Sequence, residues 1–246
     1  MSIAGLALWA LVALIVVVGL GFFARAVCDN PRNDPNTGML SALLRLYTRL
    51  VHRVRYEGLS LIPPAGEPTL FVCNHTAGID PMLVHLVSGH DIRWMMARDM
   101  RTPILETFWN WMRIIDVDRI AGDPAAAREA LRELAQGGTV GIFPEGGLER
   151  PARQLIPFEP GVGLIIKKSK ATVVPVVIDG TPQVDPAFAS LWHPSRSRVT
   201  FHEPIDYEGS GLGAKEIAQD LFERFRNWTD WPVNEHPPEI EAGHSK

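Results

Sequence analysis

An uncharged apolar run at the start of the chain is the feature that most constrains its fold. From Ile3 to Ala24 the sequence IAGLALWALVALIVVVGLGFFA contains no charged residue, and its length is about what a helix needs to cross the hydrocarbon core of a bilayer. A signal peptide normally carries a positive n-region and a shorter apolar stretch. A helix buried in a protein core is seldom apolar on every face. We therefore expect residues 1–27 to form a membrane anchor, a helix that is either transmembrane or membrane-embedded.

The residues after this run indicate how the chain is placed at the membrane. Arg25 and Arg32 follow the run, so the positive-inside rule puts the rest of the chain on the cytoplasmic side of an inner or cytoplasmic membrane. Residues 28–57 predict a loop and an amphipathic helix with apolar residues at helical spacing and Arg45 and Arg49 on its other faces. Such a helix is typical of an interfacial element attracted to anionic lipid, although an ordinary surface helix would have the same pattern.

Residues 58–231 alternate short apolar runs with helical patterns. This alternation predicts a layered α/β domain, with a mixed, largely buried sheet flanked by helices. Pro175 inside an apolar run indicates an edge strand or a local irregularity. The polar, Pro-rich residues 232–246 predict a disordered tail. The expected strands are TLFVCN, IRWMMA, RIIDVDR, TVGIFPE, TVVPVVID and RVTFHEP, and the expected helices are 123–136, 161–168 and 214–228.

Composition and missing motifs exclude several classes of protein. A formal net charge of -4 and a pI near 6.1 give no basic signal for nucleic acid. Cys28 and Cys73 match no metal-ligand spacing, and we expect neither a metal nor a cofactor. The chain has no G-x-S-x-G, HExxH or Walker motif. The stretch GSGLGA at 209–214 loosely fits a dinucleotide fingerprint, but no complete βαβ unit follows it, so we interpret it as a loop and helix start.

The segment NHTAGID, residues 74–80, brings a histidine and a carboxylate together after an apolar strand. A turn there can return Asp80 to His75, fix the tautomer of the imidazole and leave the other ring nitrogen as a general base. A structural His–Asp pair that caps a turn is the alternative. A further alternative is that Cys73 and His75 form a nucleophile pair. Since Cys73 lies in an apolar run, a buried and inert thiol is the competing interpretation.

Two further segments place polar groups after buried strands. TVGIFPEGG, residues 139–147, ends in Glu145 and two glycines, which let the backbone approach a ligand and expose amide groups. A tight turn with a solvent-facing Glu145 is the alternative. RIIDVDR, residues 113–119, ends in Arg119, a residue type suited to bidentate phosphate recognition and equally to a local salt bridge.

Together with VVPVVIDG, residues 173–180, these segments resemble the glycerolipid acyltransferase family typified by 1-acylglycerol-3-phosphate acyltransferase. NHTAGID matches its NHxxxxD block, IIDVDR is similar to the block ending in Asp-Arg, FPEGG matches the start of FPEGTR, and VVPVVIDG resembles the V-P-V block. The resemblance covers roughly residues 50 to 210 and is far more specific than any single block.

The resemblance implies a role for each matching residue. His75 would be the general base on the acceptor hydroxyl, oriented by Asp80. The acyl donor would be acyl-CoA or acyl-carrier protein, and the partners a lysolipid and the bilayer, in phospholipid biosynthesis. Backbone amides near Gly146–Gly147 would be candidates to stabilise the oxyanion. The implied substrate-binding residues are Asn74, Arg119, Glu145, Gly146, Gly147 and Arg150.

The chain departs from FPEGTR, because Gly147 and Leu148 stand for its Thr and Arg, and Arg150 or Arg153 would have to substitute. Another lysolipid or an amino-lipid is therefore a second candidate for the acceptor. A phospholipid transacylase or a catalytically silent lipid-binding protein would also fit these segments. An aromatic-rich stretch could line an acyl channel, lie at the membrane interface or pack in the core; it comprises Trp94, Phe108, Trp109, Trp111 and Met112.

Overall fold

The computed structural model describes residues 3–103, 106–118 and 123–234, and its contacts divide the chain into two units, Met1–Tyr47 and Thr48–Lys246. The first unit holds helix α1, Ile3–Cys28, and most of helix α2, Pro35–Val51. The helices approach closely where a Cβ on Gly38 would lie 1.6 Å from the carbonyl oxygen of Val27, so only glycine fits there. Among the helices in the described part of the chain, none combines the length and apolarity that a membrane crossing requires. A spanning anchor is therefore not supported.

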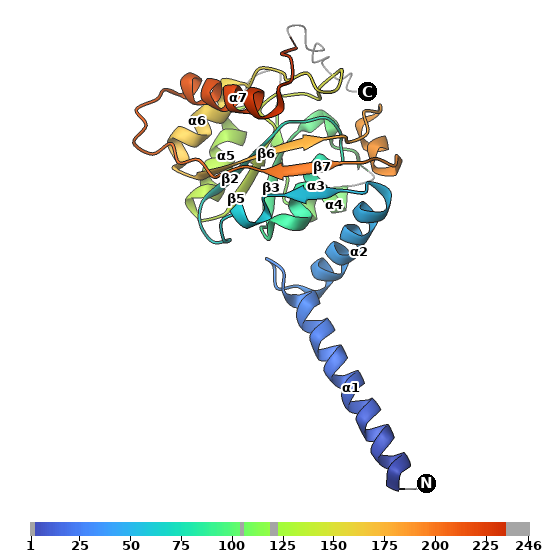
Figure 1. Cartoon of the computed structure of the whole chain (residues 1–246). Helices are drawn as coiled ribbons and strands as arrows, with labels where there is room; N and C mark the ends of the chain where they lie inside the picture. The colour runs from blue at the N-terminus through green and yellow to red at the C-terminus, as the bar shows by residue number, and fades with distance from the viewer. Residues whose placement is uncertain (1–2, 104–105, 119–122, 235–246) are drawn as a thin grey trace. The chain divides into compact units, whose positions relative to one another are not determined.

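A seven-stranded mixed sheet is the centre of the second unit (Figure 1). Its order is β1-β7-β6-β2-β5-β3-β4, and every neighbouring pair is parallel except β6 and β7. The predicted mixed α/β architecture is confirmed. The strands are β1 Arg55–Glu57, β2 Thr69–Cys73, β3 Ile92–Ala97, β4 Ile115–Val117, β5 Thr139–Ile142, β6 Thr172–Asp179 and β7 Arg198–Phe201.

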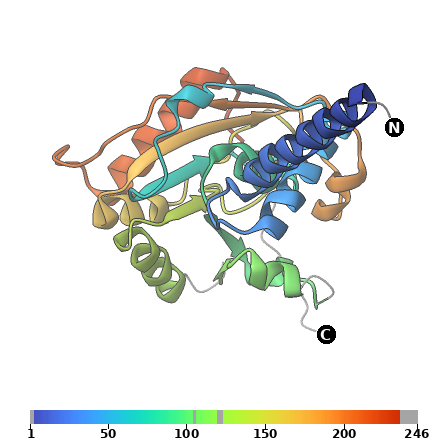
Figure 2. The same cartoon turned by 90° about the horizontal axis from the view of Figure 1, so that it is seen from below.

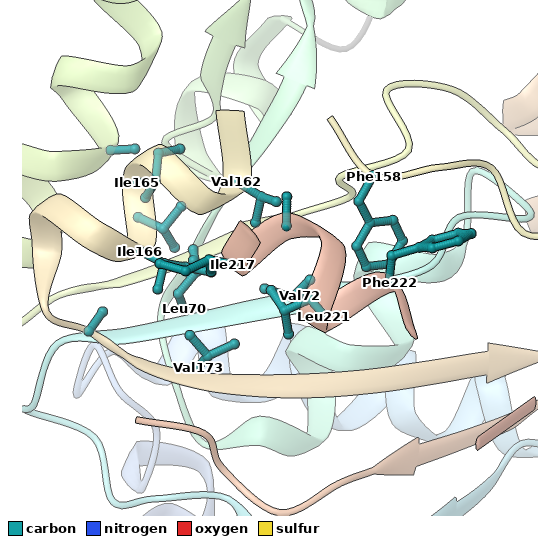
Figure 3. Packing of buried hydrophobic residues seen from close by; sticks show 14 of the residues in the cluster. Leu70, Val72, Phe158, Val162, Ile165, Ile166, Val173, Ile217, Leu221 and Phe222 are labelled. Atoms are coloured by element: carbon teal, nitrogen blue, oxygen red, sulfur yellow. The ribbon is translucent and has the colours of Figure 1, made fainter. Parts of the chain in front are cut away.

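The central strand β2 is apolar on both faces because both faces are covered. Leu70 and Val72 join a core cluster with helices α5, α6 and α7 (Figure 3), whereas Phe71 and Cys73 join a second cluster with helix α3. Figure 2 shows the strands side by side, with α5 in yellow-green beside them. The helices are α3 Asp80–Ser88, α4 Glu106–Trp111, α5 Pro124–Ala135, α6 Pro160–Ser169 and α7 Ala214–Thr229.

Local sequence signals explain where α5 and α6 begin and how closely α6 approaches α7. Asp123 caps α5 by accepting backbone N–H bonds from Ala125 and Ala126 at 2.8 and 3.0 Å. Proline opens both α5 and α6, where its missing N–H costs nothing. Gly163 lets α6 approach α7, since a Cβ there would lie 1.8 Å from the carbonyl oxygen of Ala214.

The structure differs from the sequence predictions in several places. β6 lies between β7 and β2, so Pro175 is not on an edge strand; the β7 ladder starts at Val176, beside the missing N–H, which confirms a local irregularity. Strand β1 and helices α3 and α4 were not predicted. The expected tail begins too early, because Pro232–Asn234 exchange backbone hydrogen bonds with Leu155. Residues 235–246 lie outside the described residues.

Candidate active site

The carboxyl end of β2 and the first residue of α3 bring His75 and Asp80 together. The Nδ1 atom of His75 lies 3.0 Å from Oδ2 of Asp80. The same oxygen accepts the backbone N–H groups of Thr76 and Ala77, each at 2.7 Å, and Asp80 is fully buried. These bonds hold the carboxylate in one orientation and direct Nδ1–H toward it, so Nε2 is the nitrogen available as a base.

One face of the His75 ring packs on a stack of aromatic rings. The imidazole lies on Phe143 with ring centroids 3.9 Å apart, and Phe143 lies on Trp94 at 5.0 Å. Trp94 fits because β5 has a glycine beneath it: a Cβ on Gly141 would lie 2.5 Å from the indole ring. The sequence analysis did not single out Phe143, although it belongs to the FPEGG match.

Most of the aromatic-rich stretch packs in the core. Trp94 is 2% exposed and Trp109 is 6% exposed, and Trp109 contacts Phe188 with ring centroids 5.5 Å apart. Met112 and Trp94 belong to the core cluster that also contains Phe71 and Cys73, and Phe108 and Trp111 pack against that cluster. Core packing is therefore the role that the structure gives to this stretch.

Glu145 faces the backbone of His75 and is buried, so the alternative of a solvent-facing Glu145 is wrong. Its Oε2 accepts the backbone N–H of His75 at 2.9 Å. Burial, and then the charge of Glu149, raise the pKa of Glu145 well above its usual range. Glu145 thus acts on the base through the main chain, and its prediction as a substrate-binding residue gains no direct support.

Glu149 is a buried site residue that the sequence analysis missed. It is fully buried, and burial raises its pKa from 4.5 to about 7. Its backbone N–H donates to the carbonyl oxygen of His75 at 2.7 Å. The only sequence signal was an acidic residue four positions after Glu145 where the FPEGG block departs from its usual form.

The side chain of Asn74 forms its hydrogen bonds within the protein. Its Oδ1 accepts the backbone N–H of Ile178 at 2.7 Å, and its Nδ2 donates to the carbonyl oxygen of Ile178 at 2.9 Å and to Glu149 at 3.0 Å. The side chain is fully buried. Asn74 therefore joins β2 to β6 and the Glu149 loop, and its prediction as a substrate-binding residue gains no direct support.

Two of the arginines predicted near the acceptor, Arg150 and Arg153, have protein partners. The guanidinium group of Arg150 donates to the carbonyl oxygens of Thr76 and Glu149 at 2.9 and 2.8 Å. Arg153 forms two bonds of 3.0 Å with Asp179. Arg119 lies outside the described residues. A substrate contact from any of them stays a prediction.

The two glycines after Glu145 differ in backbone conformation. Gly146 has a φ of +70°, which favours glycine, and a Cβ on Gly147 would meet nothing within 4 Å. This open space is compatible with the approach of a ligand to the backbone at Gly147. Their role with an oxyanion stays a prediction.

Cys73 is not arranged as a nucleophile. Burial, followed by the charge of Asp80, raises the pKa of its thiol well above the usual range, and a protonated thiol is a poor nucleophile. The buried, inert thiol is the interpretation that the structure supports. The GSGLGA stretch leads into α7 at Ala214, as expected of a loop and helix start.

Comparisons with known proteins show similarity in sequence family and in fold. The family model described as Acyltransferase matches residues 53–179. The crystal structure of the 1-acyl-sn-glycerophosphate (LPA) acyltransferase PlsC from Thermotoga maritima has a similar fold, with a TM-score of 0.65 at 22% sequence identity. The match covers 90% of this chain and 91% of that chain.

Proposed function

Because the chain belongs to the acyltransferase family, we propose that it moves a fatty acyl group from an acyl thioester to the hydroxyl of a lysolipid in phospholipid biosynthesis. The donor is acyl-CoA or acyl-carrier protein, and 1-acylglycerol-3-phosphate is the first acceptor to test. Support for this acceptor comes from the fold shared with the Thermotoga maritima protein, a 1-acyl-sn-glycerophosphate acyltransferase.

The arrangement of His75 suits this reaction. Its Nε2 takes the proton of the acceptor hydroxyl while the oxygen attacks the thioester carbonyl carbon. The C–O bond forms, the carbonyl oxygen becomes an oxyanion, and collapse of the tetrahedral intermediate breaks the C–S bond. A thiol has a pKa of about 8.5, so the thiolate leaves readily and then takes the proton from the imidazolium. The alcohol is the weak partner, which is why the base matters most.

The hydrogen bond between His75 Nδ1 and Asp80 is the observation that carries the proposal. The test measures acyl transfer from long-chain acyl-CoA and acyl-carrier protein to a panel of lysolipids, for wild type and His75→Ala. The rate of acyl transfer should be about 10²–10⁴-fold lower in His75→Ala, because that is the usual contribution of a general base. His193→Ala is the matched control, since His193 is exposed and its Nδ1 bonds only the local carbonyl of Ala189. If both donors gave equal transfer with wild type and His75→Ala, the proposal would be wrong.

A different headgroup is a second candidate for the acceptor. Leu148 replaces the arginine of the related block, and Arg150 and Arg153 are already bonded to protein groups. Transfer to a lysolipid or amino-lipid without a phosphate monoester, with none to lysophosphatidate, would favour this acceptor and keep the mechanism.

We also propose that α1 and α2 hold the enzyme at a membrane with its catalytic domain facing the cytoplasm. Large apolar side chains of α1 such as Phe22 and Phe23 are 73% and 61% exposed, and Leu50 of α2 is 68% exposed. Exposed apolar area of this kind favours insertion into the interface. Co-sedimentation of the full chain with phospholipid vesicles tests it, and a chain that stays in the supernatant with every vesicle composition would contradict it.

A further inference from the structure

Two buried acidic residues, Glu145 and Glu149, contact the backbone of His75. Glu145 is 4% exposed and Glu149 is fully buried. A buried carboxylate is costly unless it is paired or neutralised, and two adjacent carboxylates do not both ionise easily. The pair therefore needs a proton to be stable.

The hydrogen bonds show where this proton fits. Oε2 of Glu145 accepts from the backbone of His75, and Oε1 of Glu149 accepts from Asn74. The other two oxygens, Oε1 of Glu145 and Oε2 of Glu149, are buried and have no partner among the described residues. The charge of Glu149 raises the pKa of Glu145, so the two carboxyl groups lie close to each other. A single proton between the carboxyl groups would satisfy both remaining oxygens, since a protonated carboxyl donates and a carboxylate accepts.

The same two residues hold both polar groups of the His75 main chain. Glu145 accepts its N–H at 2.9 Å, and the N–H of Glu149 donates to its C=O at 2.7 Å. We propose that Glu149 is a positioning residue for the base: it shares one proton with Glu145, and the pair clamps the His75 peptide from both sides. This inference rests on the proposed role of His75 in acyl transfer.

Loss of the proton should loosen the clamp. Burial raises the pKa of both carboxyl groups, and that of Glu149 reaches about 7, so the pair holds its proton below neutral pH and loses it as pH rises through neutrality into alkaline solution. Two unshared carboxylates would then repel each other next to His75. Among the described residues, the titratable and charged groups near Glu149 are Glu145 and Arg150 on its own loop and His75 and Asp80 at the β2–α3 turn.

Two substitutions separate positioning from mere packing. In Glu149→Gln, the amide oxygen can still accept from Asn74 and the amide N–H can donate to Glu145 at every pH. Glu149→Ala removes both contacts and should lower kcat/KM about 100-fold, as an ångström-scale misplacement of a catalytic group does. We expect Glu149→Gln to recover most of that loss and to lack the alkaline decline of the wild type. Glu208→Gln is the matched control, because Glu208 is exposed and its carboxylate pairs with Lys170 at the surface, away from His75.

A second readout does not depend on turnover. The ring protons of His75 carry a ring-current shift from Phe143, whose centroid lies 3.9 Å away, and NMR of the full chain labelled at histidine measures it. The shift should be kept in Glu149→Gln and lost in Glu149→Ala at neutral pH. If Glu149→Ala does not fold by circular dichroism, the pH profile and His75 signal of Glu149→Gln decide alone.

The outcomes separate this inference from the proposed function. An alkaline decline in Glu149→Gln equal to that of the wild type would overturn the inference, as would a folded Glu149→Ala with wild-type rate and His75 signals. If wild type transfers no acyl group from either thioester donor, the proposed function fails, and the NMR shifts still show whether Glu149 positions His75.

Discussion

Replacing Glu149 by glutamine should change how the stability of the protein depends on pH. In the wild type, the buried carboxyl group must be neutral to avoid the cost of a desolvated charge, and it faces Glu145. Glutamine has nearly the same shape and cannot ionise. The substitution therefore removes one titration and leaves the packing of the loop nearly as it was.

The sign and size follow from the pKa of Glu149. Its pKa is raised from 4.5 in the unfolded chain to about 7 in the folded one. The folded state keeps the proton to higher pH, so the stabilisation is complete below pH 4.5, declines as pH rises, and is lost once pH passes about 7. A difference of this size corresponds to about 3 kcal/mol at 1.36 kcal/mol per pKa unit. For a chain of this length that is a change of about 6–12 °C in Tm.

Thermal unfolding measured by circular dichroism between pH 4.5 and 8 tests this reasoning. The Tm of the wild type should fall relative to that of Glu149→Gln as pH rises, and Glu208→Gln should follow the wild type. The difference should grow toward neutral pH and then level off. The reasoning would be refuted if the difference in Tm between wild type and Glu149→Gln were constant across this range. It would also be refuted if the Tm of the wild type rose relative to that of Glu149→Gln as pH increased.

Three other variants test other parts of the structure. Asp80→Asn keeps the size of the side chain but removes the charge that orients the base, so kcat should fall about 10²–10⁴-fold with little change in KM; an unchanged kcat in steady-state assays would contradict this. Gly141→Ala places a Cβ 2.5 Å from the ring of Trp94, so thermal unfolding should show a loss of about 1–3 kcal/mol from overpacking, and a Tm at or above that of wild type would be evidence against the ring stack. Arg45→Gln combined with Arg49→Gln should weaken binding to anionic vesicles about 30-fold, at about 1 kcal/mol per arginine, and leave binding to zwitterionic vesicles unchanged in co-sedimentation; an equal loss on both would point to misfolding of α2.

Much of the fold could be predicted because its signals are local. The apolar run of β2 shows a strand covered on both faces, and the structure covers both. Asp123 and Pro124 mark the start of α5, as the sequence indicated. Helix α3 was missed because its first residue, Asp80, had been assigned to a turn, and α4 was missed because it has only six residues.

The chemistry of the site could be predicted only where the partners are close in the sequence. His75 and Asp80 are five residues apart, and a turn suffices to join them. Glu145 and Asn74 depend on contacts between segments about 70 residues apart. Their roles follow from which strand ends meet in the folded sheet. The resemblance implied a substrate role for Asn74, and the hydrogen bonds of its buried amide to Ile178 and Glu149 could not be predicted from the sequence.

The shared proton also bears on the acceptor. With one charge on the Glu145–Glu149 pair, the imidazolium that forms as His75 takes the hydroxyl proton is stabilised by nearby negative charge. A second full charge on the pair would favour the imidazolium further but would repel an anionic headgroup approaching the same loop. One proton shared by Glu145 and Glu149 limits that repulsion, and the pair still holds the backbone of His75 in place. This chain has Leu148 in place of the arginine of the related block. If its acceptor is a phosphate monoester, extra negative charge on the pair would therefore weaken acceptor binding more than it would in a relative that keeps the arginine.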